Sequence, residues 1–303
     1  MVQVGLLPVC MPFGILLRCS GRMTSDTPKV LNAFIIHVSL PAVTLLHVHG
    51  LALDPSLIYP VSMAWMLFTA GLVFFVLLGR WARWTPQTVG ALILTGALAN
   101  TSFLGLPMIG AFYGNGEGEL GLGVLIDQLG TYMVLSTLGI MVAAVCSQGR
   151  FSLAGIARRV ATFTPLYALL LAYLLRPFDY PPAVVTLLEI LSATLTPLAL
   201  ISIGLQLRFA ELKGKLAPLT AGLGFKLLLG PAVILVLVTE FLGLGGRVAQ
   251  ITVFEAAMGP QIGGSIVALN HGLDRPLVIL MVGIGIPLSF ATLPLWWWLL
   301  QGV

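Results

Sequence analysis

Long apolar segments alternate with short polar loops along the whole chain. A helix needs about 20 mostly apolar residues to cross the hydrocarbon core of a bilayer. Turn-forming pairs such as Asp54-Pro55 and Thr85-Pro86 separate several of these segments. The sequence therefore predicts ten membrane-spanning helices, over residues 3–19, 29–49, 57–79, 88–112, 121–146, 160–177, 183–207, 217–240, 248–270 and 277–300.

Prolines recur inside these segments at nearly constant spacing. Offsets of 157, 156 and 153 residues relate Pro8 to Pro165, Pro41 to Pro197, and Pro107 to Pro260. Each half of the chain holds five segments, an odd number, so the second half would be inserted upside down. We predict two inverted five-helix repeats, at 1–149 and 160–303, with a short cytoplasmic linker at 150–159. The alternative is chance, because the chain contains 19 prolines.

The last of these proline pairs lies in a repeated motif, Pro-x-Ile-Gly, which begins at Pro107 and again at Pro260. A proline inside a helix removes one backbone hydrogen bond and clashes with the preceding turn. In hydrocarbon, each orphaned backbone group is costly unless protein or water satisfies it. Paired interruptions in two halves of a chain point to the binding site of a transporter. We therefore expect breaks near both prolines, in the segments 88–112 and 248–270.

Composition supports a membrane protein. The chain is 58% hydrophobic and 9% charged, whereas a soluble domain carries about 25% charged residues. The predicted fold class is an all-α membrane protein. The N-terminal apolar segment is no signal peptide, since no basic residue precedes it and no small-residue cleavage site follows it. Nucleic acid is excluded as a partner, because the net charge of +4 comes from residues in short loops.

Lysine and arginine strongly favour one set of alternate loops. That set holds Arg18, Arg22, Lys29, Arg80, Arg83, Arg150, Arg158, Arg159, Arg208, Lys213, Lys215 and Arg275. The opposite set holds only Arg176 and Arg247. Because positively charged loops stay in the cytoplasm, we predict a multi-pass protein of the bacterial inner membrane with both termini outside.

Several motifs then resemble those of the auxin efflux carrier family. They are Asn32 with Leu40-Pro41-Ala42, Asn100 with Leu104-Gly105-Leu106-Pro107, Thr196-Pro197 with Gln206, Lys226 with Gly230-Pro231, and Glu255 with Met258. The match runs along nearly the whole chain, and the short segment after residue 146 is typical of a compact bacterial member. The sequence departs from the family at Gly259, where Met or Ala is expected before the proline.

The resemblance implies a fold and a class of substrate. The family is similar in fold to bile-acid:sodium symporters and sodium/proton antiporters, which implies broken helices that cross at the centre. It also implies organic anions such as malate, malonate or auxin-like acids as substrates. The electrostatic field at broken helices suits such a substrate, because the N-termini of half-helices carry partial positive charge and favour anions.

The predicted substrate contacts gather around the proline motifs. They are Asn100, Thr101, Gly105, Pro107, Met258, Gly259, Pro260, Gln261, Pro41 and Pro197. Asn100 could donate to a carboxylate, or it could hold helices together. Thr101 could instead bond back to its own helix. Gln261 could contact substrate or cap freed carbonyl groups.

Two carboxylates inside apolar segments are the predicted coupling site. Intramembrane carboxylates are rare and by default indicate ion or proton sites. Asp127, with Gln128 and Thr131, lies in the segment 121–146, and Glu255 lies just before the second break. The resemblance to the symporters implies that Glu255 and Met258 lie where sodium binds.

Several alternatives remain open for these charged residues. Asp127 could lie at the membrane interface, and one of the two carboxylates could pair with Lys226. We expect Lys226 itself to extend toward the cytoplasmic surface, with a role as substrate counter-ion as the alternative. Either carboxylate could carry a proton in place of binding sodium.

The remaining polar and small residues add structural expectations. Spacing does not place His37, His47 and His49 on one helix face, so no metal site is predicted. The cysteines show no ligand spacing. Glycine pairs at Gly110 and Gly114, and at Gly259 and Gly263, would permit close helix approach. The tryptophans at 81, 84 and 296–298 are expected to be interfacial anchors.

These observations favour a secondary active transporter of organic anions that works by alternating access and is coupled to protons or sodium. The alternative is a cation/proton antiporter of the same fold class, which adjacent paired aspartates would favour; Asp127 is single. No enzyme motif is recognisable, so no catalytic residue is predicted. No cofactor is expected apart from a sodium ion. The predicted partners are the anion and the lipid bilayer, with a homodimer left open.

Overall fold

The computed structural model describes residues 2–24, 26–49, 51, 57–114, 116–147, 152–207 and 214–303. Within this part of the chain nearly every residue is helical, and one isolated bridge is the only β pairing. Six helical segments there are long and apolar enough to cross a membrane: Thr27–Val48, Ile58–Trp81, Gly118–Cys146, Pro182–Gln206, Leu216–Phe241 and Arg275–Leu300. Shorter apolar helices are Val9–Cys19, Thr101–Phe112 and Thr164–Leu174. The prediction of an all-α membrane protein is confirmed.

Contacts between Cα atoms divide the chain into two compact units. Unit 1 comprises Met1–Pro55, Ser102–Gln128 and Phe163–Leu207, and unit 2 comprises Ser56–Thr101, Leu129–Thr162 and Arg208–Val303. Each unit therefore takes segments from both halves of the sequence. The two-repeat division stays a prediction.

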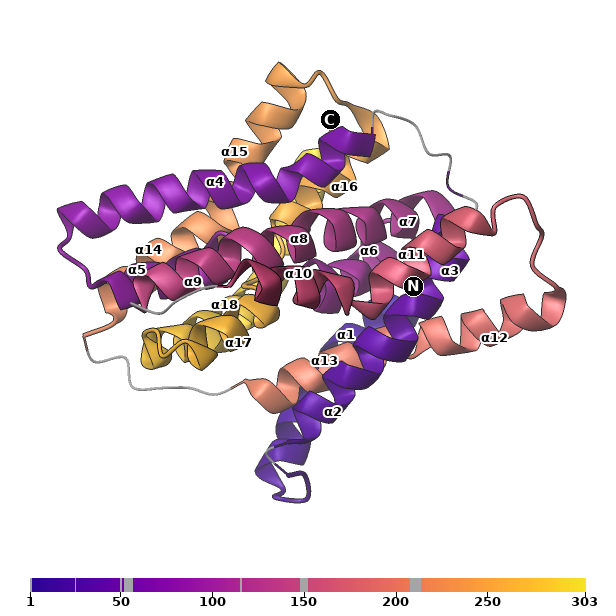
Figure 1. Cartoon of the computed structure of the whole chain (residues 1–303), viewed down its shortest axis with the longest axis horizontal. Coiled ribbons are helices and arrows are strands. Elements are labelled where there is room, and N and C mark those ends of the chain that lie inside the picture. The colour runs from indigo at the N-terminus through magenta and orange to yellow at the C-terminus, as the bar shows by residue number, and fades with distance from the viewer. Residues whose placement is uncertain are drawn as a thin grey trace. The chain divides into compact units, whose positions relative to one another are not determined.

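Unit 1 is built around α3 and around the pair formed by α1 and α13 (Figure 1). Its elements are α1 (Val2–Cys19), α2 (Thr27–Phe34), η1 (Ile35–Ser39), α3 (Leu40–Val48), α6 (Leu106–Phe112), α7 (Glu117–Leu125), α11 (Thr164–Leu174), α12 (Pro182–Ala193) and α13 (Leu195–Gln206). Helix α3 packs against α7, α11 and α12, and α1 lies along α13. Gly14 and Gly204 make the α1–α13 approach possible, because a Cβ atom at either residue would collide with the opposite backbone.

Unit 2 is organised around α5 (Pro86–Gly96), in which every residue from Gly90 to Gly96 is buried. Its other elements are α4 (Ile58–Trp81), α8 (Tyr132–Val134), η5 (Leu135–Gly139), α9 (Ile140–Cys146), α10 (Leu153–Ala161), α14 (Leu216–Gly224), η6 (Phe225–Leu229), α15 (Gly230–Val236), η7 (Leu237–Phe241), α16 (Gly246–Ala256), α17 (Ile262–Asn270) and α18 (Arg275–Leu300). Helices α4, α9, α17 and α18 all pack against α5. Two further π segments, η3 (Thr101–Gly105) and η4 (Ile126–Thr131), begin and end in different units.

Most interior prolines are absorbed without breaking a helix. A five-residue π segment ends two residues before Pro41, Pro107 and Pro231 alike, at η1, η3 and η6. The wider π turn accommodates the missing N–H and the ring, which would clash with a regular α-turn. The predicted break near Pro107 is therefore wrong in position: the chain leaves the helix earlier, at residues 97–100.

Helix α10 overlaps the predicted linker, and the Ser152 hydroxyl caps it by accepting from the Gly155 amide. Two smaller expectations are corrected. Gly114 does not support close packing; its φ of 96° ends a helix in a turn. Trp81 and Trp298 are exposed as anchors should be, but Trp296 is buried and donates from Nε1 to the Leu227 carbonyl at 2.8 Å.

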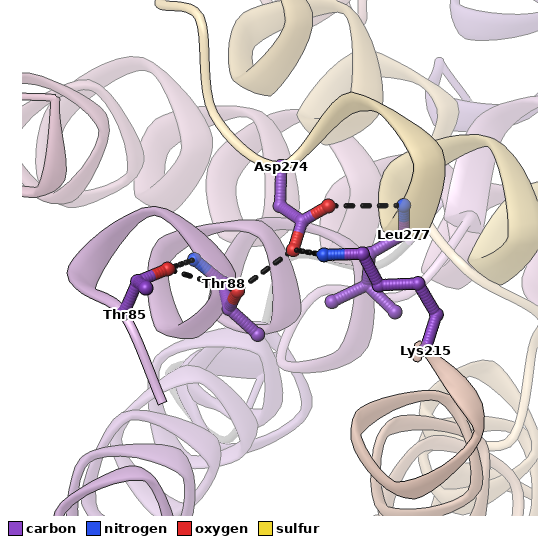
Figure 2. Close-up of polar contacts among 5 residues, drawn as sticks. All are labelled: Thr85, Thr88, Lys215, Asp274 and Leu277. Carbon is purple, nitrogen blue, oxygen red and sulfur yellow. Dashed lines mark hydrogen bonds and ion pairs between the residues drawn. The ribbon is translucent and has the colours of Figure 1, made fainter. Parts of the chain in front are cut away.

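A polar junction in unit 2 holds the ends of α5, α14 and α18 together (Figure 2). Asp274 Oδ2 accepts hydrogen bonds from Thr88 Oγ1 at 2.7 Å and Lys215 Nζ at 2.6 Å. Its other oxygen accepts from the Leu277 amide and so caps α18. Thr85 caps α5 by accepting from the Thr88 amide at 3.2 Å. The Asp274 side chain is 6% exposed, so it is a largely desolvated acceptor.

We expect Asp274→Ala to lower the free energy of unfolding by about 2–3 kcal/mol, because it removes a helix cap and two hydrogen bonds to a charged group. Asp274→Asn keeps the cap and should lose less. Thermal unfolding in detergent measures both. The exposed pair of Asp26 with Lys29 at 2.8 Å supplies the control, and Asp26→Ala should cost less than about 1 kcal/mol. Equal losses at both positions would contradict a structural role for the junction.

Candidate functional site

Two helix breaks meet in unit 2. Helix α5 ends at Gly96, and residues 97–100 are not helical; α16 ends at Ala256, and α17 begins at Ile262. Ala99 and Pro260 form an antiparallel bridge. The backbone N–H of Asn100 donates to the Gly259 carbonyl at 3.1 Å. The two unwound segments, which we call the paired break, thus satisfy part of each other's backbone, as hydrocarbon surroundings require.

Lys226 satisfies a further carbonyl of the paired break. Its Nζ donates to the Ala256 carbonyl at 2.7 Å, at the last residue of α16. The side chain is fully buried, so the expectation that Lys226 extends to the cytoplasmic surface is wrong. The physical reason is that a freed carbonyl at the negative end of a helix attracts a cation.

Glu255 adds a negative charge at the same place. It is fully buried and directly precedes Ala256, whose carbonyl accepts from the Lys226 ammonium. Of the two predicted carboxylates, Glu255 is therefore the one placed near Lys226, and a direct ion pair between them stays a prediction. A buried charge is tolerated when an opposite charge and hydrogen bonds accompany it.

Asn100 has the most unusual polar environment of the predicted substrate residues. It is fully buried, and within the described part of the chain neither its Nδ2 nor its Oδ1 has a hydrogen-bond partner. Buried amide groups are nearly always hydrogen-bonded. The predicted alternative, that Asn100 holds helices together through its side chain, finds no bond to support it among these residues. The amide is available to a bound molecule.

The other predicted residues of this half of the site surround the same break. Thr101 and Met258 are fully buried. Gln261 stands at the N-cap position of α17, but its side chain caps no amide of that helix. Its own carbonyl accepts from the Ser265 amide at 3.0 Å. The first turn of α17 therefore lacks a side-chain acceptor from its N-cap residue.

Glycine allows α18 to approach the paired break. A Cβ atom at Gly259 would lie 2.9 Å from Ser289 Oγ and 3.3 Å from Ile286 Cα. This contact explains why the larger residue that the family pattern leads one to expect is absent here. Gly264, which the sequence reading missed, faces the Leu94 carbonyl of α5 so closely that a Cβ atom would collide with it. The Gly263-Gly264 doublet was the available signal.

Asp127 and Gln128 belong to unit 1. Asp127 is 2% exposed, so its side chain lies inside the protein, and its Oδ1 accepts a hydrogen bond from Ser102 Oγ. Its depth in the membrane stays a prediction. Gln128 Nε2 donates to Thr44 Oγ1 at 2.6 Å, and that hydroxyl donates to the Leu40 carbonyl at 2.8 Å. Ser102 and Thr44 are therefore polar partners that spacing alone did not reveal.

The remaining predicted residues of unit 1 are Pro41, Gly105, Pro107 and Pro197. The segments before Pro41 and Pro197 are joined by the Ser39 and Thr194 hydroxyls, whose oxygens are 2.7 Å apart. Unit 2 holds the other predicted residues, including Thr131, which is buried and whose Oγ1 has no partner among the described residues. Each unit therefore carries its own polar centre.

A buried polar network that was not predicted lies between α2 and α13. Ser202 Oγ donates to Asn32 Oδ1 at 2.6 Å, and Gln206 Nε2 donates to Ser202 Oγ at 3.1 Å. Asn32 and Gln206 were noticed only as family motif residues. These side chains bond to each other and so stabilise the contact between α2 and α13. The Asn100 side chain has no such bond to a described residue.

The histidines serve structural contacts. His37 Nδ1 lies 2.7 Å from Thr164 Oγ1. His49 Nε2 lies 3.0 Å from the Leu175 carbonyl, and its ring stacks on Tyr180 with centroids 4.1 Å apart. Tyr180 lies in the loop between α11 and α12, where partial burial raises the pKa of its phenol. Among the described residues no group of His, Cys, Asp and Glu could hold a metal ion.

The sequence matches the family model described as membrane transport protein over residues 3–151 and 147–297. The chain belongs to this family. It is the auxin efflux carrier family that the motifs resemble, so that prediction is confirmed. A membrane transporter family is not an enzyme class.

Two archaeal relatives agree with this assignment. An uncharacterized transporter of Methanothermobacter thermautotrophicus is 28% identical over 287 residues, which cover 93% of this chain and 92% of the relative. An uncharacterized transporter of Methanocaldococcus jannaschii is 26% identical over 298 residues, covering 95% of this chain and 94% of the relative. Together with the apolar helices, these matches identify a multi-pass membrane transport protein.

The contact between Gly259 and α18 can be tested by a double-mutant cycle. Gly259→Ala should lower the free energy of unfolding by about 1–3 kcal/mol, because the new methyl group overpacks against Ser289. Ser289→Ala alone should cost little more than its bond to the Ile286 carbonyl. In the double variant the loss should be clearly smaller than the sum of the two. Strict additivity would mean that Ser289 does not limit the size of residue 259.

Proposed function

We propose that this transporter is a secondary active carrier of small organic anions. The observation that carries the proposal is the Asn100 amide, which is buried at the paired break with no hydrogen-bond partner among the described residues. Leaving a buried donor and acceptor unbonded costs about 1–3 kcal/mol. A bound molecule with polar atoms would remove that cost.

A carboxylate is the ligand class that the surroundings favour. The α17 N-terminus carries partial positive charge, and its first turn receives no side-chain cap from Gln261. Asn100 Nδ2 supplies a neutral donor beside it. Met258, Gly259 and Pro260 would shape the same place, and Thr101 follows Asn100 directly. Malate, malonate and auxin-like acids are the substrates proposed.

We place the carrier in the bacterial inner membrane as ten helices in two inverted repeats, with both termini outside. Two observations support this arrangement. The loops near Thr85, Lys215 and Asp274, all proposed to be cytoplasmic, meet in the polar junction of unit 2. At proposed outer positions, the Gly246 amide donates to the carbonyl of the C-terminal Val303 at 2.9 Å.

Transport would proceed by alternating access, with coupling through the buried carboxylates. Glu255 lies in unit 2 beside Lys226, and Asp127, with Gln128, lies in unit 1. Such residues are typical of ion and proton pathways. The same two carboxylates favour the second candidate, a cation/proton antiporter of this fold class.

Asn100→Ala should abolish saturable anion uptake. It should change the free energy of unfolding by no more than about 1 kcal/mol, because the side-chain amide that is lost has no hydrogen bond to a described residue. Proteoliposomes with labelled malate, malonate and an aromatic acid provide the measurement. Asn32→Ala is the matched control: it removes another buried amide, but one that bonds to Ser202. That variant should lose stability by about 1–3 kcal/mol.

Glu255→Gln should also abolish uptake, since it removes a buried charge of the coupling site. Normal uptake in both Asn100→Ala and Glu255→Gln would place the transport site elsewhere. If the protein showed no saturable anion uptake but moved protons when a cation gradient was imposed, the antiporter would replace the anion carrier.

A further inference from the structure

The sodium site that the symporter resemblance implies can be tested against the residues present. Sodium in such transporters is coordinated by unwound carbonyls and by the C-terminal ends of half-helices. The corresponding end here is that of α16, with Glu255 and the Ala256 carbonyl. The Lys226 ammonium already donates to that carbonyl at 2.7 Å. Glu255 is the residue directly before that carbonyl and is fully buried.

A second cation at this point would face strong repulsion. Two unit charges about 4 Å apart repel each other far more strongly in a buried site than in water. Lys226 and Glu255 are both fully buried, so water screens neither of them. The ammonium thus supplies the charge and one of the oxygen contacts that a sodium ion would otherwise supply.

Lys226 is held in this position from both sides along η6. Its neighbour Phe225 packs against Phe74 and Phe75, with ring centroids 5.0 Å apart in each case. On the other side, the Leu227 carbonyl accepts from Trp296 Nε1 at 2.8 Å. The five-residue π turn lies just before Pro231. These contacts fix the backbone on either side of Lys226, so the starting point of its side chain is held in place.

We propose that Lys226 is a tethered cation that takes the place of sodium at the end of α16, so that this carrier works without sodium at the paired break. The proposal deepens the proposed function, because it leaves the proton as the coupling ion at Glu255. Lys226 acts as a positioning residue: it neutralises Glu255 and holds the broken end of α16, and it does not need to touch the substrate.

The test is a thermal unfolding measurement on the purified full chain without substrate. The midpoint is compared in sodium chloride and in choline chloride at equal ionic strength. For the wild-type protein we expect the same midpoint in both salts. Lys226→Ala should lower the midpoint in choline chloride, since Glu255 and the Ala256 carbonyl lose their cation. Sodium should then raise it by about 3–5 °C in a saturable way, because it binds only the folded state.

Two further variants keep the outcome decisive. Lys226→Ala combined with Glu255→Gln should show no sodium-dependent rise, because the carboxylate has gone. Lys226→Arg keeps the charge and should behave as the wild type in both salts. If Lys226→Ala does not fold, the wild type and Glu255→Gln still decide the matter.

Two results would overturn the proposal. The first is a saturable sodium-dependent rise in the wild-type midpoint that Glu255→Gln removes, which would reveal a sodium site beside Lys226. The second is a folded Lys226→Ala variant that does not respond to sodium. Neither depends on anion uptake, so failure here and failure of the proposed function are distinguishable.

Discussion

The backbone of the paired break is the constraint on which the rest of unit 2 depends. Two segments of the chain leave the helical conformation inside an apolar protein, where water cannot satisfy their backbone polar groups. Asn100 and Gly259 bond to each other, and Lys226 bonds to Ala256. Helix α18 can then close over the break only because Gly259 leaves room for Ser289. Packing, charge and backbone geometry are therefore fixed together at one place.

The polar chemistry of the molecule is divided between its two units, and the two polar centres differ in kind. In unit 1, Asp127 Oδ1 accepts from the Ser102 hydroxyl and Gln128 Nε2 donates to the Thr44 hydroxyl, so each of these side chains is hydrogen-bonded within the unit. In unit 2, the Asn100 amide lies beside broken backbone with no such partner among the described residues. Asn100 therefore differs from Asp127 and Gln128 in that neither of its side-chain polar atoms bonds to a described residue.

Prolines have two different roles in this chain. Pro41, Pro107 and Pro231 each follow a π turn that absorbs the missing hydrogen bond, so the helix continues. Pro260 instead stands within the unwound segment, where no helical hydrogen bond is needed. A repeated motif around Pro107 and Pro260 thus does not imply the same local structure. Local sequence shows where a helix is under strain, but neighbouring helices decide whether it widens or breaks.

The sequence by itself determined the class of protein, the apolar helices and the family, because hydrophobic length and turn residues are local properties. It also indicated that Asn100, Glu255 and the segment around Pro260 belong together. Only the tertiary structure decided that the first break lies at residues 97–100, that Lys226 turns inward to Ala256, and that Asp127 is buried. The physical reason is that a buried polar group takes whichever partner packing brings within reach. That partner lies far away in the sequence, as Ala256 does from Lys226.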